Sequence, residues 1–147
     1  MKDFYVSVGQ SVTFSKTVSE SDVYLFAGIT GDLAPVHVNQ ALMERSAYGQ
    51  RIAHGALLVG FMSTLSTLMV AQADDALVNG ETPVALGYDR IRFTAPVFFG
   101  DTITLTYTIT AVDTVKRRSF ADIEAKNQRN EIVAVATGLL KWVRKED

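Results

Sequence analysis

The sequence predicts an α+β fold in which one antiparallel sheet curls around a single long helix. Three observations support this prediction. Residues 52–73 form an apolar run without Asp, Glu, Lys or Arg. Residues 102–110 alternate strictly between apolar residues and threonine. Several further β-rich runs fill the second half of the chain, which indicates a sheet there.

The first elements are a strand and a short helix. Residues 12–18 (VTFSKTV) are β-branched and partly alternating, which is typical of a strand. Ser19 then supplies a helix cap with Asp22 three residues later, so a helix should follow. Gly28 and Gly31 bring this helix to an end and leave Asp32 at a turn.

Residues 38–50 indicate a short helical or irregular segment before the apolar run. The run approaches the length that crosses a bilayer, but His54, Gln72 and several hydroxyl residues would make a poor lipid-facing surface. We therefore interpret it as a central helix that begins near Gly55 and is wrapped by the sheet.

The remaining chain predicts a polar loop at residues 74–82 and then four strands. The strands are residues 84–93, 102–110, 119–126 and 131–143, with a polar turn at 127–130 that joins the last two into a hairpin. No repeat or linker composition interrupts the chain, so residues 1–147 are expected to form a single domain.

Composition limits the classes of function. The chain has 147 residues, a formal charge of −2 and no cysteine. A cysteine nucleophile, a thiolate metal site and a disulfide framework are excluded, and no net positive charge attracts nucleic acid or an anionic membrane. The first residues lack the pattern of a secretory signal, so we expect a cytoplasmic protein whose partner is a small molecule or another subunit.

Two histidines flank the segment between the turn at Asp32 and the central helix. In the first motif, Gly31-Asp32-Leu33-Ala34-Pro35-Val36-His37, a carboxyl and an imidazole stand five residues apart on a bent loop, which suits acid/base chemistry. The alternative is structural, because an Asp after Gly often bonds its own backbone and a loop histidine is often only solvated.

The second motif is His54-Gly55 at the start of the apolar helix. The free N–H groups of a helix N-terminus can stabilise an oxyanion, and Gly55 would let a ligand approach closely. Alternatively, Gly55 only permits tight packing. Further along this helix, Ser63 is a hydroxyl that a loop acid could reach, or it bonds its own helix backbone.

The segments FAGITGDLAPVH, RIAHGALLVGFMS and RIRFTAPVFFGDTITL together resemble the MaoC-like dehydratase family, which includes the (R)-specific enoyl-CoA hydratases. The resemblance implies a hot-dog fold, a homodimer or higher homo-oligomer, and an acyl-thioester tunnel at or near the subunit interface. It implies that Asp32 and His37 are the catalytic pair, that the N–H of Gly55 forms the oxyanion hole, and that Ser63 and His54 support them. Ala34 stands where many relatives have Asn, which implies an altered loop geometry or substrate preference.

The function implied is hydration of a trans-2-enoyl thioester, or the reverse dehydration, by a hydro-lyase. The substrate would be an acyl-CoA or acyl-carrier-protein thioester, with coenzyme A present only as part of the substrate and no metal or other cofactor. A hot-dog thioesterase and a non-catalytic acyl-thioester binding subunit are the alternatives. A third alternative is an iron site at Asp32, His37 and His54.

The sequence leaves the acyl chain length open, because it depends on packing among aromatic residues that could line the tunnel. These residues are Phe61, Tyr88, Phe93 and Phe98. The basic run Lys116-Arg117-Arg118 stands at a predicted hairpin turn and is expected to be solvated.

Overall fold

The structure is a computed structural model that describes residues 4–73, 76 and 79–146. In chain order the elements are β1 (Ser11–Thr17), α1 (Glu20–Thr30), α2 (Pro35–Val38), α3 (Gln40–Met43), α4 (Gly55–Gln72), β2 (Glu81–Phe93), β3 (Thr102–Asp113), β4 (Arg118–Lys126) and β5 (Ile132–Arg144). Of the predicted loop 74–82, residues 74, 75, 77 and 78 lie outside the described residues.

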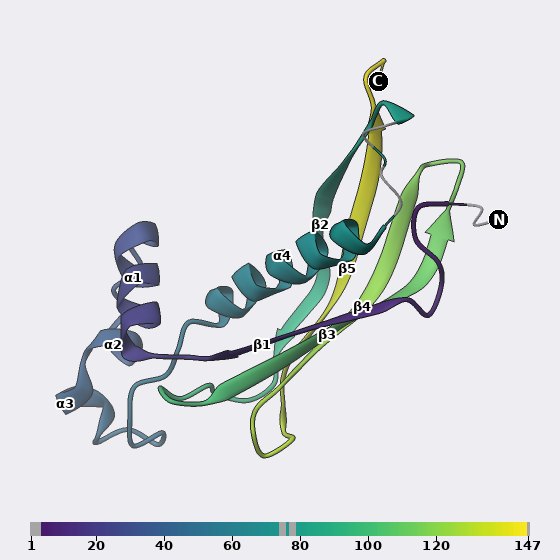
Figure 1. The fold of residues 1–147 in the computed structure, drawn as a ribbon. Helices are drawn as coiled ribbons and strands as arrows, with labels where there is room; N and C mark the ends of the chain where they lie inside the picture. Colours follow the sequence, from purple (N-terminus) through teal and green to yellow (C-terminus); the bar gives the residue numbers. More distant parts are fainter. Residues whose placement is uncertain (1–3, 74–75, 77–78, 147) are drawn as a thin grey trace.

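The five strands form one sheet in the order β1-β3-β4-β5-β2, and each neighbouring pair is antiparallel. The strands curve around α4, which crosses one face of the sheet (Figure 1). The predicted arrangement of an antiparallel sheet around one long helix is therefore confirmed, and the predicted hairpin corresponds to β4 and β5.

The alternation in β3 sorts its side chains to the two faces of the sheet. Its apolar residues are buried toward α4, and they are Ile103, Leu105, Tyr107 and Ile109. The threonines point the other way and bond the hydroxyls of β1. The oxygens are 3.0 Å apart for Ser11–Thr108, 2.7 Å for Ser15–Thr104 and 2.7 Å for Thr17–Thr102. A period of two thus supplies a core face and a hydroxylated outer face.

Strand β2 lies at the sheet edge beside β5 and begins at Glu81, three residues before the predicted start at residue 84. The edge position explains this difference, because Pro83 lacks an N–H and a proline is tolerated where one side of a strand has no partner. Two register shifts interrupt the pairing, and Arg90, within the second, has a positive φ of 53°. The strand therefore bends before it reaches Phe93.

Helix α4 packs one face on the sheet and leaves another open. Its buried residues are Leu58, Phe61, Met62, Leu65, Ser66 and Met69. Its length and composition would suit a membrane span, but these contacts are those of a core helix. The residues on its open side are small and exposed: Ala56, Gly60, Ser63, Thr67 and Ala71.

Helix α1 begins and ends as its sequence predicts. The Ser19 hydroxyl accepts from the Asp22 N–H, the Asp22 carboxylate accepts from the Ser19 N–H, and Gly31 ends the helix in a left-handed conformation with φ 80°. Helices α1 to α3 lie together beyond the end of α4 where Gly55 stands (Figure 1). This excursion from the sheet carries Asp32 and His37.

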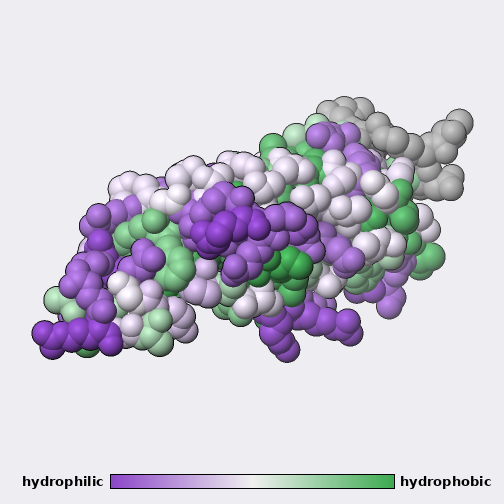
Figure 2. All heavy atoms as spheres, turned by 90° about the horizontal axis from the view of Figure 1, so that it is seen from below, coloured by the Kyte–Doolittle hydropathy of each residue, from purple (hydrophilic) through white to green (hydrophobic). Residues whose placement is uncertain are grey.

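The surface seen from below is mostly hydrophilic or of intermediate hydropathy (Figure 2). Hydrophobic side chains gather there in small separate areas. This distribution agrees with strands that turn threonines outward and apolar residues toward α4.

Candidate active site

Asp32 lies directly after α1, where Gly31 turns the chain. Its N–H donates to the Thr30 hydroxyl at 3.2 Å, and its Oδ1 accepts from the Ala34 N–H at 3.3 Å. These local bonds are the structural role that an aspartate at a glycine corner commonly has. The side chain is still 52% exposed, so its remaining carboxylate lone pairs are open to a ligand.

His37 lies on α2, a four-residue helix that the sequence did not predict at this position. Pro35 fits the first turn of this helix because a proline needs no acceptor there. The His37 Nδ1 is 2.7 Å from the main-chain oxygen of Ile52. A carbonyl oxygen can only accept, so Nδ1 carries a proton, and the neutral ring has its lone pair on Nε2.

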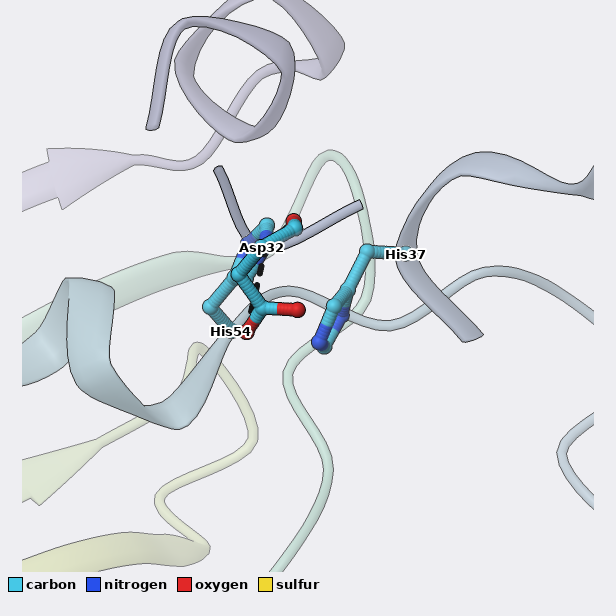
Figure 3. Close-up of side chains that lie close together, drawn as sticks. All are labelled: Asp32, His37 and His54. Atoms are coloured by element: carbon cyan, nitrogen blue, oxygen red, sulfur yellow. Dashed lines mark hydrogen bonds and ion pairs between the residues drawn. The ribbon is translucent and has the colours of Figure 1, made fainter. Parts of the chain in front are cut away.

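His54 precedes α4 and is only 2% exposed. Its Nε2 donates to the main-chain oxygen of Asp32 at 2.9 Å, and its ring stacks on the His37 ring, with centroids 3.7 Å apart and planes inclined by 25°. The ring of Phe26 contacts it as well, with centroids 4.7 Å apart. The structure thus brings Asp32, His37 and His54 together from three segments (Figure 3).

One ligand atom from each of these three residues lies within 4.8 Å of the others, which is close enough to consider a metal ion. The orientation does not favour one. The nitrogen lone pairs of stacked rings lie in two nearly parallel planes, so they do not converge on one point. The His54 Nε2 and the His37 Nδ1 already bond main-chain oxygens, which leaves the His37 Nε2, the buried His54 Nδ1 and the Asp32 Oδ2 without a main-chain partner.

A pocket of about 330 Å³ opens beside the histidines. Its lining comes from α2, from the segment that leads into α4, and from the end of β2 and the segment after it. The lining residues are His37, Tyr48, Ile52, Ala53, His54, Gly55, Leu58, Phe93, Thr94, Ala95, Pro96 and Val97. Asp32 is outside this lining, and its Oδ2 is 4.0 Å from the His54 Nε2.

Gly55 is the first residue of α4, so its N–H has no acceptor within the helix, and Gly55 lines the pocket. Its missing side chain also matters. A Cβ built at Gly55 would lie 2.6 Å from the Cδ2 and Cε2 atoms of the Phe93 ring. Both sequence interpretations of Gly55, tight packing and close approach of a ligand, therefore have a physical basis at this position.

Ser63 is not brought to the Asp32–His37 pair within one chain. It is exposed and lines a second hollow of about 150 Å³ with residues of α4, β2 and β5. Two helical turns separate it from Gly55, which is about 12 Å along a helix. Of the aromatic residues expected to line a tunnel, Phe93 lines the main pocket, whereas Tyr88 bonds Ser66 beneath α4 with 3.3 Å between the hydroxyls.

Arg51 is a site-forming residue that the sequence did not indicate. Its guanidinium donates to Glu20 at 3.2 Å, to the Tyr24 hydroxyl at 2.8 Å and to Gln40 at 3.0 Å, and lies over the ring of Phe99. These contacts join α1 and α3 to the segment before α4 and so hold the loops around the pocket. The hydrogen-bond partners are up to 31 residues away along the chain, so no local pattern marks them.

The family model of the MaoC-like domain matches residues 3–133. The chain belongs to this family. Its MaoC-like sequence is 38% identical over 107 residues to the (R)-specific enoyl-CoA hydratase of Rhodospirillum rubrum, which covers 73% of this chain and 68% of that protein. It is 27% identical over 142 residues to the 3-hydroxybutyryl-CoA dehydratase of Methylorubrum extorquens, which covers 97% and 84%.

Among solved structures, the (R)-hydratase of A. caviae involved in PHA biosynthesis superposes with a TM-score of 0.80 at 26% identity, covering 92% of this chain and 96% of that one. The predicted hot-dog fold is therefore confirmed. The named relatives are hydratases and dehydratases, so the predicted reaction class, a hydro-lyase, is confirmed too.

Proposed function

We propose that this MaoC-like protein catalyses the reversible hydration of a trans-2-enoyl thioester to the (R)-3-hydroxyacyl thioester. Asp32 and His37 would act as the acid/base pair, and the N–H of Gly55 would bind the thioester oxygen. The substrate class and the (R) product are drawn from the names of the relatives, an (R)-specific enoyl-CoA hydratase and a 3-hydroxybutyryl-CoA dehydratase. The roles of the residues are those that the family resemblance implies, and the contacts of these residues support them.

One observation carries this proposal: the His37 Nε2 and the Asp32 Oδ2 have no main-chain partner and belong to side chains that reach solvent, whereas the other unused acceptor of the cluster, the His54 Nδ1, is buried. A water molecule between them can donate one hydrogen bond to each acceptor. The same pocket contains the N-terminus of α4, which offers N–H donors to an oxyanion.

The proton balance of hydration is simple. The water oxygen bonds to C3 while the acid/base pair takes one proton from that water, and the electron pair of the C2=C3 bond moves toward the thioester oxygen. The pair then returns one proton to C2, so it ends the cycle in its starting protonation state. Because the two groups are coupled, the proton transfers belong to the pair and not to either residue alone.

The thioester oxygen gains negative charge when C3 is attacked. The Gly55 N–H at the positive end of α4 would donate to it, and removal of one such donor in other enzymes costs about 3 to 4 kcal/mol of transition-state stabilisation. A backbone donor cannot be deleted by a side-chain change, so a substitution that displaces the start of α4 tests it.

The test is a spectrophotometric assay with crotonyl-CoA, in which loss of the conjugated thioester absorbance reports hydration. We expect turnover by the wild type, and in Asp32→Asn and His37→Gln a loss of at least about a hundredfold in kcat. Asp122→Asn is the matched control, because Asp122 is an exposed aspartate on β4 and should leave the rate unchanged. Full activity in Asp32→Asn would refute the acid/base assignment.

The same reaction mixture separates the two alternatives. A thioesterase would release free thiol from crotonyl-CoA, which a thiol reagent detects, whereas a hydratase leaves the thioester intact. A binding subunit would retain crotonyl-CoA in equilibrium dialysis without consuming it. Chiral analysis of the product tests the (R) configuration, and a panel of coenzyme A and acyl-carrier-protein substrates of different lengths tests the carrier and chain preferences.

We also propose a homodimer, with α4 and β2 at the interface. The open side of α4 presents the stripe of small residues that begins at Ala56, and beside it the edge strand β2 exposes Val84, Leu86 and Phe93. Small side chains allow two helices to approach closely, and an apolar edge strand is otherwise a site of uncontrolled association. Ser63 belongs to this stripe, so its supporting role is proposed at the interface.

Sedimentation of the wild type and of Leu86→Lys tests the dimer. A charge on the edge strand should shift the wild-type dimer to monomer, whereas Leu42→Lys, an equally exposed leucine on α3, should not. A monomeric wild type would refute the interface. The predicted cytoplasmic location stays a proposal, which fractionation of the source cells can test.

A further inference from the structure

His54 contacts both members of the proposed acid/base pair. It is 2% exposed, its Nε2 is 2.9 Å from the main-chain oxygen of Asp32, and its ring lies face to face with that of His37 at 3.7 Å. The carboxylate of Asp32 is exposed and turned toward the same space, as Figure 3 shows. His54 therefore contacts both groups while it is itself withdrawn from solvent.

The contacts of His54 determine its tautomer. The main-chain oxygen of Asp32 can only accept, so the His54 Nε2 carries the proton. Its Nδ1 is buried and has no hydrogen-bond partner among the described residues. In their neutral forms the two rings therefore differ, because His54 has its proton on Nε2 and His37 has its proton on Nδ1.

The short segment before α4 carries both restraints on His37. The Ile52 oxygen accepts from the His37 Nδ1 at 2.7 Å, and two residues later the His54 ring covers the face of the same imidazole. The segment is itself fixed, because the Ile52 N–H donates to the Val36 oxygen at 3.0 Å and the Ala53 N–H donates to the Val97 oxygen at 2.8 Å. One restraint fixes the ring nitrogen and the other fixes the ring plane.

We propose that His54 is a positioning residue that fixes the Asp32 carboxylate relative to the His37 Nε2. It would act through its bond to the Asp32 main chain and through its stack on His37, without exchanging a proton with substrate. This inference rests on the proposed function, because it assigns a role within the same acid/base pair. Placement of reacting groups matters steeply, since a displacement of about 1 Å can cost about a hundredfold in rate.

Three substitutions separate the two contacts. His54→Gln keeps an N–H donor of similar reach and loses the stacking ring. His54→Phe keeps a ring and loses the donor. His54→Asn loses both, but asparagine is a preferred helix cap, and His54 is the N-cap of α4 without a side-chain capping bond. The asparagine variant should therefore fold at least as stably as the other two while it loses the positioning contacts.

The expected result is a loss of about tenfold in kcat for His54→Gln and His54→Phe, and a larger loss, about a hundredfold, for His54→Asn, with KM changed less than about threefold. Phe26→Leu is the matched control, because it removes a contact to the same ring and leaves both positioning contacts in place. If His54 were only structural, kcat would follow Tm across the series. That result, or unchanged kcat in His54→Asn, would overturn the proposal.

Nitrogen-15 NMR of the imidazole rings tests the same proposal without turnover. The wild type should show one ring protonated on Nδ1 and one on Nε2 at neutral pH, and His54→Asn should retain only the Nδ1 form and show faster amide exchange at residues 32–34. Two rings of the same tautomer, or unchanged exchange in His54→Asn, would overturn the positioning role. A wild type that gives the expected spectra but does not hydrate crotonyl-CoA would refute the proposed function alone.

Discussion

Gly55→Ala places a methyl group between the start of α4 and the Phe93 ring. The added Cβ would lie 2.6 Å from two ring carbons, so the ring must move by about 1 Å to restore ordinary carbon–carbon contact. Phe93 is 52% exposed and can move without unfolding the core. Alanine is also the better helix former by up to about 1 kcal/mol, so the free energy of unfolding should change little.

Activity should respond more strongly than stability. The substituted residue keeps its backbone N–H, so any loss arises from the displaced ring and the shifted helix start, and a displacement of this size predicts a ten- to hundredfold lower kcat/KM. Crotonyl-CoA hydration measures it. Gly28→Ala on α1 is the control, because a Cβ there meets nothing within 4 Å and should leave the rate unchanged.

A double substitution tests the cause of the loss. In Gly55→Ala/Phe93→Leu the smaller leucine side chain makes room for the added methyl group. Gly55→Ala should therefore lower the activity less in the Phe93→Leu background than in the wild type. Independent, additive losses would show that the Phe93 contact is not the cause. Full activity in Gly55→Ala itself would refute the requirement for glycine.

Three further substitutions test other parts of the fold. Burial alone would raise the pKa of Glu81, but its bonds to Arg117 and Arg144 outweigh burial and lower the pKa. These bonds therefore stabilise the fold fully above about pH 5, and this stabilisation is lost as the pH falls through the lowered pKa. Glu81→Gln should lower the free energy of unfolding by about 3 kcal/mol at pH 7, and the Tm of the variant should fall less steeply at acid pH than that of the wild type. An equally steep fall in both proteins would contradict this. Gly138→Ala should destabilise the core by about 1 to 3 kcal/mol in urea unfolding, because its Cβ would lie 2.7 Å from Tyr107 Cε2; an unchanged midpoint would contradict it. Ala34→Asn supplies the missing side-chain cap of α2, so amide exchange at residues 36–38 should slow by about fivefold, and faster exchange would refute the capping argument.

The predictable parts of the fold were those in which a local pattern and the tertiary contacts agree. The capping box at Ser19, the glycine end at Gly31 and the alternation of β3 each specify their element within a few residues of sequence. The early start of β2 was missed because Pro83 argues against a strand unless its edge position is known. Helix α2 was missed because four residues are too few to form a helix without tertiary support, here the Ile52–Val36 bond.

The candidate site was predictable in its residue types and only partly in its geometry. The motif spacing brought Asp32, His37, His54 and Gly55 into consideration, and the structure places these four at one end of α4. The supporting role of Ser63 stays a prediction, because helical rise carries this residue to a different hollow. Neither the histidine stack nor the Arg51 contacts follow any local pattern, since their partners come from separate segments.

The paired rings at the centre of the site also make the protein unusually easy to observe. The chain contains two histidines and no cysteine. Every imidazole resonance therefore arises from the pocket. The two rings differ in which nitrogen holds the proton, so this difference assigns their signals without a labelled fragment. A single cysteine introduced on α3 would likewise carry a probe at one position, and ligand entry could be followed from both sides of the pocket in the same sample.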